Sequence, residues 1–155
     1  MGHAYSLYPE IVRVPLIVHV PSALRSQWEW NESRAAFTTD LTPTLHRLLG
    51  HEWRAPAGFF GEPLMRVPGT VEPSSRDRMV AASYGAVYGA VLDGGTRYYV
   101  YDAINMREMA FALDNGHRPG EPRTVTADLR DRGIEVIRHT VAEVAEFYHF
   151  HPDQR

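Results

Sequence analysis

The stretch VAASYGAVYGAVLDGGTRYYVYDAI, residues 80–104, decides the fold class of this chain. Apolar and aromatic residues recur with a period of two on both sides of a glycine turn at residues 93–95, which predicts a β-hairpin. The segment MREMAFALD, residues 106–114, adds another strand. Five tyrosines of this region could line a pocket, but we expect them to pack across the strands: Tyr84, Tyr88, Tyr98, Tyr99 and Tyr101.

After these strands the apolar period changes to that of a helix over residues 127–148. Apolar side chains recur at spacings of three and four, which predicts one apolar helix face formed by Ile134, Ile137, Val141, Val144 and Tyr148. Asp128 and Arg132 are expected to form an exposed i,i+4 ion pair on the same helix. Residues 76–155 therefore predict an α+β subdomain, in which one long C-terminal helix lies across a small antiparallel sheet.

The pattern of the first 75 residues is different. Residues 11–20 are apolar at nearly every position and rich in β-branched side chains, which predicts a strand buried on both faces of a helix-covered sheet. Residues 38–50 predict a short helix that Thr39 or Asp40 caps and that Gly50 ends. Its leucines at positions 41, 45, 48 and 49 share one face, so we expect this helix to pack on a sheet.

This strand and helix are expected to belong to a larger α/β sheet than residues 1–75 can form. The following residues, 51–78, are rich in proline and glycine and predict an irregular connection. The sequence thus predicts two parts, a remnant of an α/β domain over residues 1–75 and the α+β subdomain over residues 76–155.

Composition excludes several kinds of chemistry. The 155 residues contain no cysteine, which removes disulfides, thiolate nucleophiles and the common zinc motifs. They contain no lysine either, which removes Schiff-base chemistry and phosphate-loop lysines. The net charge of −3 offers no electrostatic footprint for nucleic acid, and no apolar run approaches the roughly 20 residues of a membrane span.

Several motifs, taken in order, resemble the C-terminal third of the sulfatase family within the alkaline-phosphatase superfamily. They are GHAYSLYPEIVRVPLIVHVP at residues 2–21, DLTPTLHRLLG at 40–50, GEPLM at 61–65, RYYVYDA at 97–103 and EMAFALDNG at 108–116. The resemblance covers most of residues 3–115. It implies that a large α/β domain precedes the strand at residues 11–20 in the parent enzyme, which accounts for the abrupt start of that strand.

The resemblance also implies that most catalytic residues of the parent enzyme lie in the preceding α/β domain. Sulfatases attack the ester with a formylglycine made from Cys or Ser in a Cys/Ser-x-Pro-x-Arg motif, beside a divalent cation such as calcium, magnesium, manganese or zinc. Such a cation polarises the ester oxygens and lowers the pKa of the attacking hydroxyl. Neither that motif nor the run of acidic metal ligands occurs here. We therefore expect no catalytic residue, no metal ligand and no activity in this chain by itself.

Two residues are candidates for contact with the substrate. His3 stands near the position where relatives place a Lys or His on the sulfate or phosphate oxygens; alternatively, it is a terminal residue without function. Arg13 could contact an anion, although we favour a role in tying the predicted strand to a neighbouring loop. His149 and His151 are expected to be surface residues rather than metal ligands, and Asp40 a helix cap rather than a metal ligand.

Two other functions remain open. The chain could be a stand-alone binding or interaction module derived from a sulfatase, and it would then cover the strand at residues 11–20 by self-association. It could instead be a small metalloenzyme that uses its eight histidines, which is the weakest of the three hypotheses. The expected partner is therefore either a missing N-terminal α/β domain or a second copy of the chain.

Overall fold

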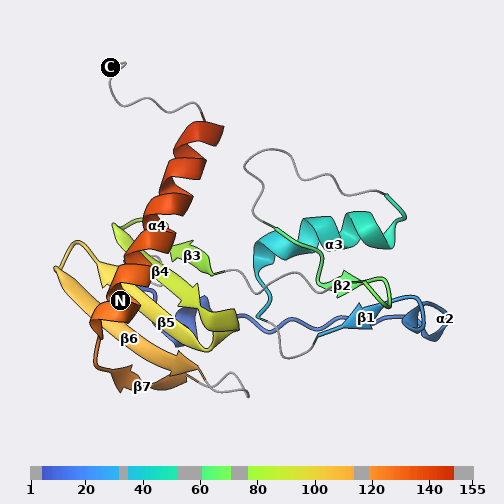
Figure 1. Ribbon diagram of the computed structural model, residues 1–155, viewed down its shortest axis with the longest axis horizontal. Helices are drawn as coiled ribbons and strands as arrows, with labels where there is room; N and C mark the ends of the chain where they lie inside the picture. Colours follow the sequence, from blue (N-terminus) through green and yellow to red (C-terminus); the bar gives the residue numbers. More distant parts are fainter. Residues whose placement is uncertain (1–4, 32–34, 52–60, 71–76, 114–118, 149–155) are drawn as a thin grey trace. The chain divides into compact units, whose positions relative to one another are not determined.

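The computed structural model describes residues 5–31, 35–51, 61–70, 77–113 and 119–148 (Figure 1). The chain divides into two compact units, one of residues 1–15 and 75–144 and the other of residues 16–74 and 145–155. The sequence pattern placed residues 1–75 together, whereas this division groups residues 5–15 with the sheet that follows residue 75.

The first unit is built on a five-stranded antiparallel sheet, where the sequence predicted a small antiparallel sheet of a hairpin and a further strand. The strand order follows the chain, β3-β4-β5-β6-β7. Together with the helix α4, this sheet confirms the predicted α+β class. The strands are β3 (Arg78–Ala81), β4 (Val87–Leu92), β5 (Arg97–Asp102), β6 (Arg107–Leu113) and β7 (Pro119–Arg123).

The turn between β4 and β5 sets the register of the central hairpin. It forms the short 3₁₀ element η3 (Asp93–Gly95), in which Asp93, Gly94 and Gly95 all have positive φ. Glycine adopts this conformation without the steric cost that a Cβ atom imposes. The turn aligns Leu92 with Arg97, so that Tyr98 and Tyr99 point to opposite faces of the sheet.

The helix α4 (Ala127–Phe147) covers one face of this sheet (Figure 1). Leu129 packs there against Ala90, Leu92, Tyr99 and Ala110, and side chains of the next two helical turns join them, including Ile134 and Ile137. The predicted helix and the first part of its apolar face are therefore confirmed. The later part of that face was predicted wrongly, because Val141 and Tyr148 are exposed.

A segment from the start of the chain covers the opposite face. Leu7 is buried there among Val87, Tyr98, Val100 and Phe111. The short helix α1 (Pro9–Val12) follows, and Val12 at its end packs against the same cluster. Thus the sheet has two apolar faces, one covered by the helix that follows it in the chain and the other by a segment distant in sequence from the strands.

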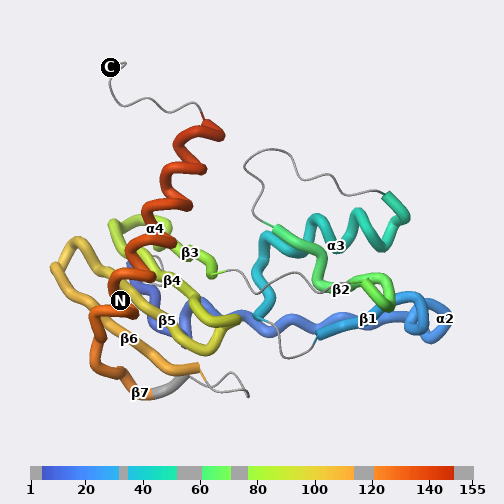
Figure 2. The backbone as a smooth tube through the Cα atoms, in the orientation of Figure 1, coloured from blue at the N-terminus to red at the C-terminus, as the bar shows by residue number. Residues whose placement is uncertain are grey.

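The strand predicted over residues 11–20 does not form. Residues 11 and 12 belong to α1, and residues 13–20 continue without a helix or a strand (Figure 2). The apolar side chains of residues 14–18 are exposed instead of buried, with Ile17 92% exposed and Val14 68% exposed. A strand needs a neighbour for its backbone N–H and C=O groups, and none of the described strands pairs with this segment. Pro15 removes one of the donors as well.

The second unit contains a two-stranded sheet and one longer helix. β1 (Glu29–Trp30) pairs with β2 (Met65–Arg66) in antiparallel register, so the described part of the connection predicted at residues 51–78 includes a short strand. The helix α3 (Leu41–Leu48) follows the 3₁₀ element η2 (Thr38–Asp40) and ends before Gly50, whose φ is +77°, as predicted. The short helix α2 (Ser22–Arg25) precedes β1.

The burial of α3 differs from the prediction. Its buried residues are Pro43 and Thr44, whereas none of the leucines expected to pack on a sheet is buried and Leu48 alone is half-buried. Leu49 is 72% exposed, and Leu41 and Leu45 are exposed too. The apolar spacing identified the helix correctly, but it could not specify a surface on which the helix packs.

Candidate functional site

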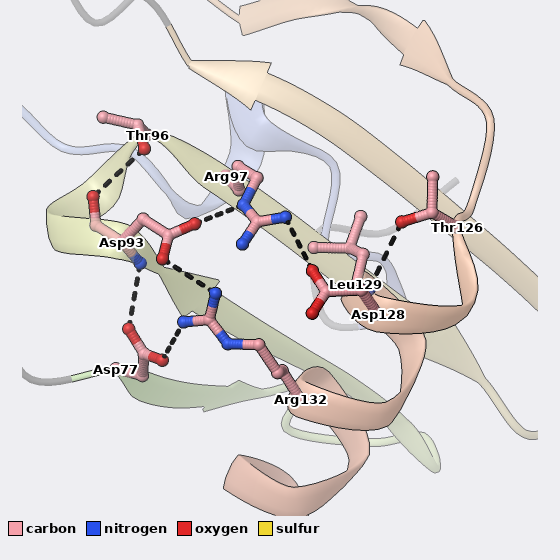
Figure 3. A network of polar contacts seen from close by, with 8 residues as sticks. All are labelled: Asp77, Asp93, Thr96, Arg97, Thr126, Asp128, Leu129 and Arg132. Atoms are coloured by element: carbon pink, nitrogen blue, oxygen red, sulfur yellow. Dashed lines mark hydrogen bonds and ion pairs between the residues drawn. The ribbon is translucent and has the colours of Figure 1, made fainter.

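The most extensive polar cluster among the described residues joins α4 to the sheet (Figure 3). Arg132 on α4 reaches two carboxylates, with Nη2 at 2.8 Å from Oδ2 of Asp77 and Nη1 at 2.9 Å from Oδ1 of Asp93. The backbone N–H of Asp93 also donates to Oδ1 of Asp77, at 2.9 Å. One guanidinium therefore connects the helix to the start of β3 and to the β4–β5 turn.

Arg97 on β5 makes the matching connection from the sheet to the start of the helix. Its Nε donates to Oδ2 of Asp93, and its Nη1 lies 3.2 Å from Oδ2 of Asp128 (Figure 3). The predicted ion pair between Asp128 and Arg132 is thus wrong, because each of the two pairs with sheet residues instead. Asp128 and Arg132 form ion pairs with other elements and not with each other, because Asp77, Asp93 and Arg97 lie within reach of the first two turns of the helix.

The charges in this cluster hold one another ionised. The hydrogen bond from Arg97 lowers the pKa of Asp93 below its usual value despite some desolvation, and Arg132 acts in the same direction. The same contacts raise the pKa of Arg97 and Arg132. A carboxylate kept ionised by two guanidinium groups is a poor general acid near neutral pH. The arrangement therefore suits a structural clamp and not acid–base catalysis.

A second polar cluster lies beneath α4. Arg130 donates from Nε to Oε1 of Glu108 at 2.8 Å and from Nη2 to Oε2 at 2.5 Å, and the phenol of Tyr99 donates to Oε1 at 3.1 Å. The hydrogen bonds from Arg130 lower the pKa of Glu108. Burial, followed by the charge of Glu108, raises the pKa of Tyr99. Tyr99 thus stays protonated and serves as a hydrogen-bond donor rather than as a nucleophile.

In the second unit, Asp40 is a buried carboxylate with a structural role. It is 1% exposed, and its side chain accepts hydrogen bonds from the backbone N–H of Phe37 at 3.0 Å and of Glu62 at 2.9 Å. The sequence pattern suggested that the side chain of Asp40 caps α3, but it makes no such capping bond. It instead connects the residues just before the helix to Glu62, 22 residues later in the chain.

Thr44 extends this connection. Its hydroxyl donates to the carbonyl of Asp40 at 2.6 Å and accepts from the N–H of Leu64 at 2.8 Å. Arg47, one turn later, donates to the carbonyl of Met65 at 3.2 Å. The motif DLTPT at residues 40–44 therefore binds the motif GEPLM at 61–65 through side-chain to backbone hydrogen bonds. We name these contacts the α3 clamp.

Of the two substrate-contact candidates, the structure describes only Arg13. His3 lies outside the described residues. Arg13 is exposed, directly after α1, and its backbone N–H donates to the carbonyl of Pro9 at 3.2 Å. The expected tie to a neighbouring loop is not seen among the described residues, where its guanidinium has no hydrogen bond or ion pair.

The histidines and tyrosines singled out by the sequence have mixed outcomes. His149 and His151 lie outside the described residues. Within the described ranges, no group of three or more His, Asp or Glu side chains could hold a metal ion. The cross-strand packing of the tyrosines is confirmed for three of them, since Tyr88 faces Tyr101 in the β4–β5 register and Tyr98 is buried against Phe111.

The sequence did not predict the polar cluster that joins α4 to the sheet, formed by Asp77, Asp93, Arg97 and Arg132. The only available signal was a set of charged residues at the ends of predicted strands, and such residues are commonly solvated. Their pairing depends on where α4 crosses the sheet, which no local pattern specifies.

Comparison with known proteins revealed no matching family model, no matching curated protein and no matching solved structure. None of the described helices is long and apolar enough to cross a membrane.

Proposed function

We propose that this chain forms the C-terminal part of a sulfatase-like hydrolase of sulfate, phosphate or phosphonate esters. In this proposal the chain supports the substrate cleft and forms one wall of it, while an α/β domain supplies the nucleophile. The motifs quoted above support the family, since they occur in the expected order over residues 3–115. The chain by itself is expected to be inactive.

One observation supports a missing α/β domain most directly. The apolar side chains of residues 14–18 are exposed, among them Leu16, Ile17 and Val18. Burial of such side chains is worth roughly 1.5–3 kcal/mol each. Large contiguous exposed apolar patches mark interaction surfaces in soluble proteins. In the proposed parent enzyme, the α/β domain would cover this segment.

The exposed leucines of α3 support the same proposal. Leu41, Leu45 and Leu49 lie one turn apart along the helix and are all exposed. An amphipathic helix of this kind normally packs its apolar stripe on a neighbouring layer. The α3 clamp keeps the helix joined to residues 62–65, so the unit would present a preformed surface to the α/β domain.

The described carboxylates do not fit a metal site of this chain's own. Asp93 and Glu108 are each bound by guanidinium groups, and Asp40 accepts two backbone N–H groups. The divalent cation of the proposed hydrolase would therefore be held by side chains of the α/β domain. Arg13, which is exposed, and His3 remain the candidates for contact with the ester oxygens.

An antibody against the helix at residues 127–147 tests this proposal. The polypeptide that it precipitates from the source cells should contain peptides upstream of Met1 and should hydrolyse an aryl sulfate or aryl phosphate. Activity should fall on treatment with a metal chelator, and the purified 155-residue chain should show none above buffer. A precipitated polypeptide of 17.6 kDa without hydrolase activity would refute the proposal.

The same exposed segment favours a second candidate function, a stand-alone module that associates through residues 14–18. Light scattering coupled to size-exclusion chromatography separates the two. A monodisperse oligomer that Ile17→Asp converts to a monomer supports the module. Val67→Asp is the matched control, because Val67 is an exposed aliphatic residue of the same unit outside this segment. A monomer in both variants and in the parent chain would rule out the module.

A further inference from the structure

We draw no further inference here: the strongest candidate, the exposed apolar patch that Tyr5 forms with Tyr84 of the β3–β4 turn and Ile104 of the β5–β6 turn, carries none because nothing in the structure shows what covers it.

Discussion

The phenol of Tyr98 donates a hydrogen bond to the backbone carbonyl of Leu7 at 3.0 Å, across 91 residues of sequence. Both groups are buried, and burial raises the pKa of Tyr98 well above its usual value, so the phenol remains a donor at any ordinary pH. This bond joins the start of the chain to the centre of the sheet. Leu7, with Val12 packed beside it, is therefore part of the first unit's core.

Tyr98→Phe tests this connection. The substitution keeps the ring but leaves the buried carbonyl of Leu7 without its donor, which costs about 1–3 kcal/mol. We expect faster amide hydrogen exchange in β4 and β5 and a lower urea midpoint. Tyr84→Phe is the control, because Tyr84 is largely exposed, and it should change stability by less than about 0.5 kcal/mol. Equal effects of the two substitutions would contradict a role for the bond.

Gly133→Ala tests the close approach of α4 to the sheet. A Cβ atom at Gly133 would overlap Cδ1 of Tyr99 and lie 2.8 Å from its Cγ. Alanine in a helix interior normally stabilises by about 1 kcal/mol relative to glycine, yet here we expect a net loss of about 1–3 kcal/mol from overpacking.

A double-mutant cycle identifies the cause of that loss. Adding Tyr99→Ala removes the ring that the new methyl group would strike, so Gly133→Ala should cost less in the Tyr99→Ala background than in the parent chain. Additive effects in thermal unfolding would show that the two residues do not compete for space.

Asp40→Asn tests the α3 clamp. An amide has one acceptor oxygen where the carboxylate has two, so the substitution removes one of two part-buried hydrogen bonds, from the N–H of Phe37 or of Glu62. We expect a loss of about 1–3 kcal/mol in the local stability of α3, measured by amide hydrogen exchange of residues 41–48. Thr39→Ala, at the exposed neighbouring position, should leave this exchange unchanged. Protection of α3 in Asp40→Asn equal to that in the parent chain would rule out the clamp.

The free energy of unfolding should decrease at acid pH, because the carboxylates that pair with arginines of α4 become protonated. The pKa values of Asp93 and Glu108 are lowered in the folded chain. Their contribution is therefore complete above the unfolded pKa values of about 3.9–4.3 and disappears as the pH falls from there toward the lower folded values. We expect the free energy of unfolding to decrease below about pH 5, and the decrease to be shallower in Glu108→Gln.

The matched variant for this measurement is Glu143→Gln on the exposed helix surface. Glu143 lies 3.4 Å from His139 in the i,i+4 position and takes no part in binding α4 to the sheet. Its substitution should leave the decrease in the free energy of unfolding at acid pH unchanged. A pH dependence in Glu108→Gln identical to that of the parent chain would contradict the role of the Arg130 pair.

Ile17→Ser tests the exposed apolar segment. The side chain is 92% exposed, so its replacement should change the free energy of unfolding by less than about 0.5 kcal/mol. It should nevertheless weaken binding of the chain to the proposed α/β domain when the two are expressed together, measured by co-purification. Val67→Ser should co-purify as well as the parent chain. Loss of fold in Ile17→Ser would show that the segment is buried in solution.

The sequence by itself determined the elements whose signals are local. The β4–β5 hairpin follows from alternating side chains around Asp93-Gly94-Gly95, and α3 and α4 follow from apolar spacings of three and four together with Gly50 as a stop. Such patterns depend on neighbours within one helical turn or one strand pair, so they can be predicted without knowing the rest of the chain.

Only the tertiary structure decided which of these surfaces are buried and which charges pair. Ile17 and Leu49 are apolar residues of the kind found in protein cores, but no described neighbour covers them. Leu7 is buried because it packs against Tyr98 and Phe111, which lie far from it in the sequence. Asp128 and Arg132 have the spacing of an ion pair but bind Arg97 and Asp77 instead. Burial and ion pairing are properties of contacts between distant segments, and the free energy of those contacts depends on a packing arrangement that no local pattern encodes.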